Sequence, residues 1–256
     1  MFHFKPIILA GFILALATPF GQASAAQDIK DVIFAAIANP TRPDSDTKQD
    51  ADRKSLEVLT FSGVKPGDSV ADFIPGGGYV TRLFSKIVGK NGNVYAVVPQ
   101  ELPEHSAETM KKLAMNPEYA NVTVVRMPVN HFQPPKKLDM VWTSMNYHDL
   151  HNKFFGPANL KMLNKAIYDA LKPGGIFLVL DHAAAAGSGV RDTNTLHRID
   201  PEVVKKEVEA AGFKLEAESD ALKNPADNHT MKVFNPAIRG KTDKFIFKFR
   251  KPMASD

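Results

Sequence analysis

The feature that most constrains this chain is a short apolar run, a glycine cluster and an amphipathic stretch that follow one another closely. Residues Ser69–Phe73 form the apolar run, and Gly76, Gly77 and Gly78 come soon after it. Over Tyr79–Val88 the apolar residues recur at the i, i+3, i+4, i+7, i+8 spacing of a helix with one buried face. The pattern therefore predicts a buried strand, a tight turn and a helix.

Units of the same kind continue to the end of the chain. From residue 69 onward, short apolar runs alternate with amphipathic stretches, which is typical of βα units around a mostly parallel sheet. We predict strands at residues 69–73, 93–98, 122–127, 140–145, 176–181, 213–219 and 244–249. We predict helices at residues 28–38, 79–88, 158–171 and 201–211, and a further helix through Leu56 and Leu59. Two long loops, at residues 183–199 and between the last two strands, are expected to cover a site.

The N-terminus has the composition of a secretory signal peptide. Lys5 precedes an apolar run from Ile7 to Ala17, and Ala23-Ser24-Ala25 supplies the small residues of a cleavage site. The apolar run is shorter than the roughly 20 residues that a membrane-spanning helix needs. We therefore predict a signal peptide at residues 1–25, a helical extension at 26–60, one domain at 61–256, and a periplasmic or secreted protein without a membrane span after cleavage.

Composition excludes several classes of function. The 256 residues contain no cysteine, which excludes disulfides, thiolate chemistry and cysteine-rich metal sites. The 32 Lys and Arg residues are interspersed with 28 Asp and Glu residues, so no basic stripe of the kind that nucleic-acid binding requires is present. We predict no nucleic-acid partner, and composition says nothing of the oligomeric state.

Two glycine turns together resemble a known superfamily. Leu171-Lys172-Pro173-Gly174-Gly175 precedes a predicted strand, as a similar turn does before the fifth strand of class I S-adenosylmethionine-dependent methyltransferases. Gly78-Tyr79-Val80-Thr81, together with residues 88–94, is similar to the first motif of protein isoaspartate methyltransferases, and Asp72 matches the acidic residue of that motif. Residues 146–149 and 196–200 are similar to those of a family of exported, predicted methyltransferases of Gram-negative bacteria.

The resemblance implies a fold, a cofactor and a reaction. The fold is an α/β, Rossmann-like class I methyltransferase fold, with a mostly parallel seven-stranded sheet, helices on both faces and an antiparallel last strand. The cofactor is S-adenosylmethionine, and the reaction is methyl transfer to a small molecule or an exposed side chain. The residues expected to contact the cofactor are Asp72, Pro75, Gly76, Gly77, Gly78, Tyr79, Gln100 and Asn146.

Polar residues that follow the fourth and fifth predicted strands are candidates for catalysis, because open α/β sheets bind ligands beyond the carboxyl ends of their strands. These candidates are Tyr147, His148, Asp181 and His182. His148 is the first candidate for a general base and His182 the second, since a histidine can take a proton near neutral pH. Either histidine could instead only hydrogen-bond its own loop, and Tyr147 is expected to pack over the cofactor or the acceptor.

Two departures from the superfamily motif leave a second hypothesis open. Ile74 stands where the motif usually has glycine, and Val98 stands where an acidic residue usually accepts from the ribose, although Gln100 or Glu101 could substitute. The alternative is a non-catalytic or repurposed ligand-binding module. A third hypothesis is a metal-dependent hydrolase that uses His148, His151, His182, His197, His229, Asp149, Asp181 and Asp200. Because no recognised ligand motif occurs, we predict no metal ligand.

Overall fold

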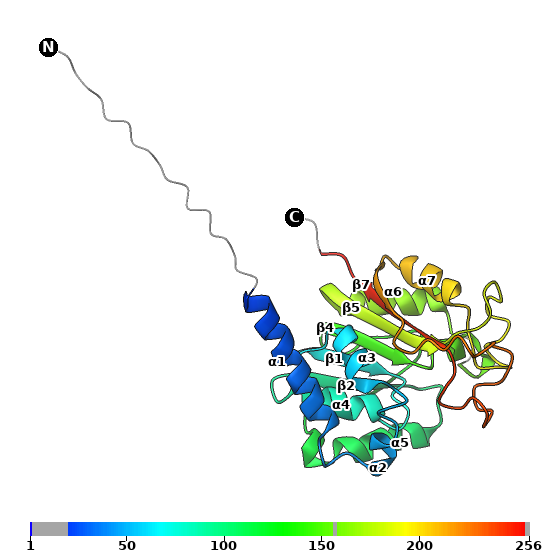
Figure 1. The fold of residues 1–256 in the computed structure, drawn as a ribbon, viewed down its shortest axis with the longest axis horizontal. Coiled ribbons are helices and arrows are strands. Elements are labelled where there is room, and N and C mark those ends of the chain that lie inside the picture. The colour runs from blue at the N-terminus through cyan, green and yellow to red at the C-terminus, as the bar shows by residue number, and fades with distance from the viewer. Residues whose placement is uncertain (2–19, 156–157, 254–256) are drawn as a thin grey trace.

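The structure, a computed structural model, describes residue 1 and residues 20–155 and 158–253 (Figure 1). The predicted signal peptide therefore lies mostly outside the described residues and stays a prediction. Helix α1 (Phe20–Ile37) begins before the predicted cleavage site after Ala25 and extends to within one residue of the predicted helix end. In the described part of the chain, no helix is both long and apolar enough to cross a membrane.

A seven-stranded sheet forms the centre of the molecule, in the order β3-β2-β1-β4-β5-β7-β6. Its strands are β1 (Ser69–Phe73), β2 (Asn93–Pro99), β3 (Val122–Met127), β4 (Leu138–Ser144), β5 (Leu171–His182), β6 (Lys214–Ser219) and β7 (Lys244–Arg250). Neighbouring strands from β3 to β5 pair in parallel, and β7 pairs antiparallel with both β5 and β6. The predicted fold class is therefore confirmed.

Burial on both faces explains why these segments are strands. All five residues of β1 are buried, as are six of the seven residues of β2, which suits apolar runs in a parallel sheet covered on both sides. Strand β5 is longer than predicted, because it begins at Leu171, which pairs with Leu138 before the glycine turn. The predicted helix at 158–171 is correspondingly shorter in the structure, where α6 spans Leu160–Ala170.

Helices cover the two faces of the sheet unequally. On one face, α1, α3 (Ser55–Ser62), α4 (Tyr79–Val88) and α5 (Glu104–Ala114) share a core with the strands. On the other face lie α6 and α7 (Pro201–Glu209), seen above the sheet in Figure 1. The predicted helix at 79–88 matches α4 at both ends, whereas α5 was not placed by the sequence pattern.

The carboxyl ends of the parallel strands meet at one edge of the sheet, where long loops gather (Figure 1). After β4 the chain forms a short 3-10 helix, η2 (His148–His151), with η3 (Lys153–Phe155) beyond it. The segment at 183–199 follows β5, and the segment at 220–243 connects β6 to β7. Between α1 and α3 lies a segment that we call the arm, residues 38–54, which contains α2 (Asp44–Thr47). A further 3-10 helix, η1 (Pro117–Tyr119), precedes β3.

Candidate active site

The glycine turn between β1 and α4 presents open backbone at the carboxyl edge. Gly76 and Gly77 are exposed, and a Cβ added at either one would meet no atom within 4 Å. Gly78 is different, because its φ is +82° and an added Cβ would lie 2.6 Å from Leu113 Cδ1. The first two glycines thus leave room for a ligand, and the third lets α4 pack closely against α5.

Ile74 occupies a backbone conformation that favours glycine. Its φ is +61°, in the left-handed region where a β-branched residue is a clear outlier. Hydrogen bonds hold it there, because its N–H donates to Val97 O at 3.0 Å and its carbonyl accepts from Asn146 Nδ2 at 3.0 Å. The isoleucine therefore adopts the backbone turn that a glycine would make, at the cost of local strain. Asn146, which follows β4, stabilises this turn through its hydrogen bond to Ile74 O.

Asp72 lies inside the protein rather than at the ligand-accessible edge. The Thr81 hydroxyl donates to its Oδ2 at 2.6 Å, and the residue is 3% exposed. Burial raises the pKa of the carboxyl to about 6, although the hydrogen bonds from Thr81 oppose the rise. The structure thus assigns Asp72 to the joint between β1 and α4, which does not fit the predicted direct contact with a cofactor.

The end of β2 carries no carboxylate free to accept from a ribose. Val98 is buried, and Gln100 is exposed beyond it with its N–H bonded to Met127 O at 2.9 Å. Both carboxylate oxygens of Glu101 accept from the Val129 N–H at 3.0 Å, so this side chain turns towards the end of β3. Neither Gln100 nor Glu101 lines the cavity described next.

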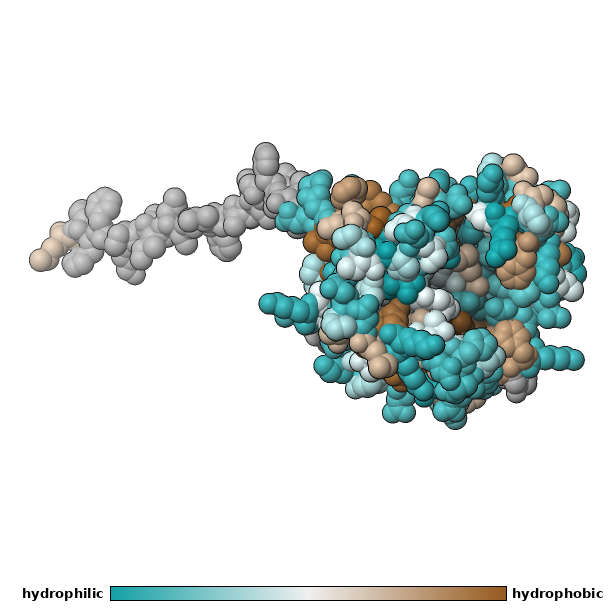
Figure 2. Space-filling view, turned by 90° about the horizontal axis from the view of Figure 1, so that it is seen from below, coloured by the Kyte–Doolittle hydropathy of each residue, from teal (hydrophilic) through white to brown (hydrophobic). Residues whose placement is uncertain are grey.

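A cavity of about 540 Å³ lies beside the glycine turn, between the arm, the start of α4, the ends of β4 and β5, and the β6–β7 loop. Figure 2 shows the hollowed face, with apolar residues inside a mainly hydrophilic rim. Of the predicted site residues, Tyr79 and His182 line it. Its remaining lining is Gln49, Asp52, Arg53, Ser55, Val58, Leu59, Val80, Leu83, Trp142, Ser144, Met145, Leu180, Leu222, Val233, Phe234, Arg239, Gly240 and Lys244.

Cations in this wall lack carboxylate partners. Within the described ranges, no carboxylate lies within 4.0 Å of the charged nitrogens of Arg53 or Lys244. Arg53 lies over the Tyr79 ring at 4.3 Å from its centroid, and Lys244 is 6% exposed, with its Nζ donating to Thr242 O at 2.9 Å. Burial, with Arg53 nearby, lowers the pKa of Lys244 to about 8. A ligand that carries an anionic group would supply the missing charge.

The arm is tied to the start of α4 by charged contacts. Arg82 forms two hydrogen bonds with the Asp46 carboxylate, at 2.6 and 2.9 Å, and donates to Gly77 O at 2.9 Å. The Tyr79 hydroxyl donates to Asp50 Oδ1 at 2.5 Å. Burial of the ring, together with this contact, raises the pKa of Tyr79 to about 12. One wall of the cavity is therefore held against the helix that follows the glycine turn.

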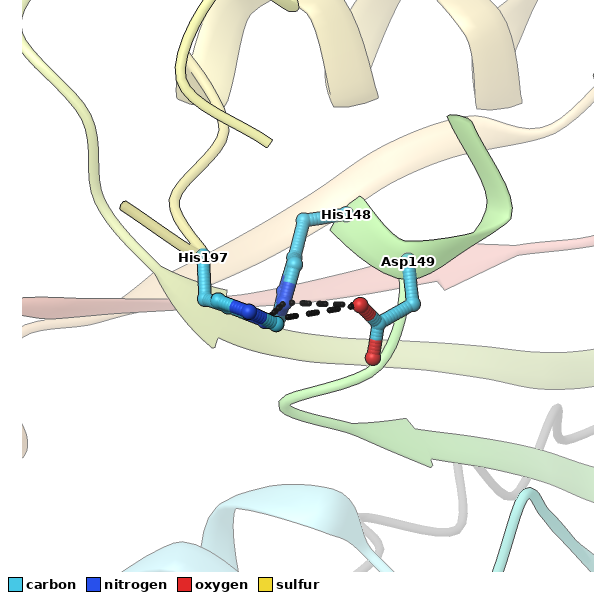
Figure 3. Close-up of side chains that lie close together, drawn as sticks. All are labelled: His148, Asp149 and His197. Atoms are coloured by element: carbon cyan, nitrogen blue, oxygen red, sulfur yellow. Dashed lines mark hydrogen bonds and ion pairs between the residues drawn. The ribbon is translucent and has the colours of Figure 1, made fainter. Parts of the chain in front are cut away.

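The structure brings into contact His148 and Asp181, two of the candidates that the sequence placed at the ends of the fourth and fifth predicted strands, although no contact between them was predicted. The two Asp181 oxygens contact His148 Nδ1 at 2.8 Å and the His148 N–H at 2.7 Å. His148 Nε2 lies 3.2 Å from His197 Nδ1 and 3.3 Å from Asp149 Oδ1 (Figure 3). Burial lowers the pKa of His148, but Asp181 and Asp149 outweigh burial and raise it to about 10. This direction does not suit a general base at neutral pH.

His182 lines the cavity, and its pKa is shifted in the opposite direction to that of His148. Burial lowers its pKa to about 3, against the opposing effect of Asp181, so the ring is neutral at neutral pH. Its Nδ1 lies 2.8 Å from Thr242 Oγ1, which fixes the ring from the β6–β7 loop. A neutral imidazole can accept a hydrogen bond from a ligand, but such a low pKa makes it a weak base.

Tyr147 does not lie over a ligand, which corrects that expectation. Its side chain is wholly buried on the α6 and α7 side of the sheet, where its hydroxyl donates to Glu207 Oε2 at 3.0 Å and accepts from Asn164 Nδ2 at 2.8 Å. The apolar ring and its satisfied hydroxyl explain this position. Pro75 is half-buried in the glycine turn itself.

Sequence reasoning missed the residues that the arm and the first turn of α3 contribute. Arg53 and Ser55 line the cavity, yet they precede the glycine turn by about 20 residues, and no local pattern indicates that the arm folds over α4. Met145 could have been found, because it directly follows β4 at the carboxyl edge. Its φ of +59° adds a second strained backbone beside Ile74.

The strand order, the antiparallel β7 and the glycine turn at the carboxyl edge define the fold of class I S-adenosylmethionine-dependent methyltransferases. In sequence, the chain is similar to the ubiquinone/menaquinone biosynthesis C-methyltransferase UbiE of Psychromonas ingrahamii, with 28% identity over 178 residues. The match covers 64% of each protein, so the chain spans less than two thirds of this relative. No protein-family model matches the chain.

Solved structures support the same fold. A methyltransferase from Aquifex aeolicus superposes with a TM-score of 0.58 at 17% identity, covering 88% of this chain and 98% of that one. The [4+2]-cyclase SpnF also has a TM-score of 0.58, at 16% identity, covering 91% of this chain and 96% of its own. Since a cyclase and a methyltransferase share the fold, the fold alone does not define the reaction.

Proposed function

We propose that the protein is an S-adenosylmethionine-dependent methyltransferase. The observation that carries the proposal is the pair of exposed glycines, Gly76 and Gly77, which open the carboxyl edge of the sheet beside a cavity of about 540 Å³. That volume is within the range of roughly 300–1,000 Å³ for small-molecule sites. Sequence similarity to a C-methyltransferase supports the same reaction class.

The glycine turn and the cavity wall can contact different parts of the cofactor. Backbone at Gly76 and Gly77 can approach the methionine end closely, with Tyr79 at the junction with the cavity. The cofactor's carboxylate is a suitable partner for Arg53 or Lys244, which have no carboxylate contact in the described residues. When bound, S-adenosylmethionine would supply an electrophilic methyl group on a sulfonium.

The cavity favours a small molecule over a protein side chain as methyl acceptor. Its lining is mainly apolar, including Trp142, Met145 and Phe234, and the arm and the β6–β7 loop enclose it from two sides. His182 is placed to accept a hydrogen bond from the attacking atom, because burial lowers its pKa and keeps the ring neutral. Positioning, rather than strong base catalysis, is therefore the main contribution that we infer for these residues.

We also propose that the protein is exported, on the basis of the signal-peptide composition of residues 1–25. The cofactor would then have to be supplied outside the cytoplasm. If no cofactor bound, a ligand-binding module on the same fold would be the function to pursue, since Ile74 and Val98 depart from the usual motif.

Substitution of Gly77 tests the cofactor site. Calorimetric titration with S-adenosylmethionine and with its demethylated product is expected to show micromolar binding to the native protein. Gly77→Leu is expected to weaken that binding at least about tenfold, because the added side chain fills the open space in front of the turn, whereas Gly77→Ala should weaken it less.

The matched control is Ala120→Leu, which introduces the same side chain at an exposed position after η1. It should bind like the native protein. Absence of binding to the native protein up to millimolar concentration would reject the methyltransferase proposal. Equal binding by Gly77→Leu and the native protein would place the cofactor away from the glycine turn.

A further inference from the structure

Three side-chain atoms form a compact triangle next to the cavity. They are His148 Nε2, Asp149 Oδ1 and His197 Nδ1, contributed by η2 and by the 183–199 segment (Figure 3). The two nitrogens are 3.2 Å apart, and the oxygen lies 3.3 Å from His148 Nε2 and 3.6 Å from His197 Nδ1. Residues almost 50 positions apart in sequence thus direct two imidazoles and a carboxylate at one point.

The size of this triangle suits a small divalent ion. Zinc binds histidine nitrogen and carboxylate oxygen at about 2.0–2.2 Å, and tetrahedral angles then separate neighbouring ligand atoms by roughly 3.3–3.5 Å. The three distances in the structure, 3.2, 3.3 and 3.6 Å, lie close to that separation. An ion could therefore be bound by all three atoms with little movement of the side chains.

A second layer of hydrogen bonds holds the triangle in place. Asp181, which is wholly buried, contacts Nδ1 of His148 and so leaves Nε2 directed at the triangle. Asp149 Oδ1 accepts from Asn152 Nδ2 at 3.1 Å. Histidine ligands of metals commonly donate their other N–H to a carboxylate in this way, which fixes the tautomer and the ring orientation.

The site is also accessible from solvent. The side chain of His148 is 2% exposed, but those of Asp149 and His197 are 20% and 23% exposed. The Phe234 ring, which lines the cavity, packs against the His197 ring at 4.8 Å between centroids. A bound ion would thus lie beside the cavity, with its fourth position available to water or to a ligand atom.

We propose that His148, Asp149 and His197 bind a divalent first-row transition-metal ion, with zinc the best fit to the spacing, and that Asp181 orients His148. The proposal is independent of methyl transfer and departs from the expectation that the chain has no metal ligand. The competing explanation is a hydrogen-bonded triangle, in which a protonated His148 donates from Nε2 to its two neighbours. In that case no metal would bind.

Metal titration decides between the two explanations. The purified protein, without a histidine tag and after treatment with a chelator, is titrated with zinc by calorimetry and with Co²⁺ by visible absorption. One equivalent of zinc with a micromolar or lower dissociation constant is expected, together with the intense absorption of four-coordinate Co²⁺. His197→Ala and Asp149→Asn should each weaken zinc binding at least about tenfold.

His229→Ala is the matched control. Its side chain is 24% exposed, compared with 23% for His197, it too has a positive φ, and it contacts Asp243 at 2.9 Å outside the triangle. This variant should bind zinc like the native protein, and circular dichroism should show all three variants folded. No saturable binding up to millimolar zinc, or equal affinities for folded His197→Ala, Asp149→Asn and native protein, would overturn the proposal.

Discussion

At the scale of single residues, the carboxyl edge combines strained backbone with buried charge. Ile74, Met145 and His197 all have positive φ, and Asp72 lies beneath the turn with its carboxyl in the core. Such features each cost stability and persist only where the surrounding structure holds them. Their concentration at one edge is a further reason to place a functional site there.

The buried carboxyl of Asp72 should make stability depend on pH. Its pKa is raised to about 6, so the folded state favours the neutral form, and the stability gained is present below about pH 4 and is lost as the pH rises through 6. Asp72→Asn cannot ionise and should gain roughly 2–3 kcal/mol relative to the native protein between pH 4 and 7.5. Urea unfolding at several pH values measures this difference.

Asp28→Asn provides the comparison, because Asp28 is exposed on α1. Its unfolding free energy relative to the native protein should not change over the same pH range. A difference between Asp72→Asn and native protein that is independent of pH would show that the buried carboxyl is not responsible.

Local pattern predicted the elements better than it predicted the site. Strand β1, helix α4 and strand β3 have the predicted ends, because the apolar spacing and the flanking turns determine them locally. Strand order placed His148 and Asp181 at neighbouring strand ends, but the direct contact between them is visible only in the structure. The predicted position of Tyr147 was wrong, because its ring packs on the α6 and α7 side of the sheet, where Glu207 and Asn164 satisfy its hydroxyl, and no local pattern indicates that packing.

At the scale of elements, a buried ion pair joins the two long loops. Arg198 donates to Asp227 at the base of the 220–243 segment, and both side chains are 0% exposed with a 2.8 Å contact. Arg198 also donates to the carbonyls of Ala183 and Met231 at 2.9 and 3.1 Å. The loops that flank the cavity and the His148 triangle are therefore one connected structure.

Removal of this arginine should loosen both loops. Arg198→Met leaves the Asp227 carboxylate buried without its partner, which is expected to cost about 3–5 kcal/mol. Hydrogen exchange should increase in residues 183–199 and 220–243 together. Arg191→Met is the control, because its contact with Asp192 is made by a side chain that is 68% exposed, so its loss should change stability little. Faster exchange in only one of the loops would show that Arg198 does not couple them.

At the scale of the whole molecule, the N-terminal helices and the sheet share one core. Ile33 and Ala36 of α1 and Val58 and Leu59 of α3 are buried in the same cluster as the residues of β1 and β4. The predicted boundary after residue 60 therefore separates segments that are packed together in the structure. Helix α1 packs against α3, and α3 in turn contributes residues to the cavity wall.

Truncation of a side chain on α1 tests whether the molecule unfolds as one unit. Ile33→Ala removes a side chain that is 0% exposed and should cost about 2–5 kcal/mol, whereas Phe34→Ala, at a position 63% exposed, should be nearly neutral. Trp142 is the single tryptophan and lies in β4, so its fluorescence reports on the sheet. In Ile33→Ala, the midpoint of the thermal transition followed by Trp142 fluorescence should fall together with the midpoint followed by the helical circular dichroism signal. A tryptophan transition that did not move would show that α1 and the sheet unfold separately.

The enclosure of the cavity by two distant segments has a kinetic consequence. Asp52 of the arm and Gly240 of the β6–β7 loop both line the cavity and lie close together, since a Cβ added at Gly240 would lie 3.4 Å from Asp52 Oδ2. The arm is held to α4 by Arg82 and Tyr79. Movement of either segment would change the width of the hollow through which a ligand enters and leaves. Motions of this kind take microseconds to milliseconds and commonly limit turnover, so for the proposed methyltransferase we expect product release, rather than bond making, to limit the rate.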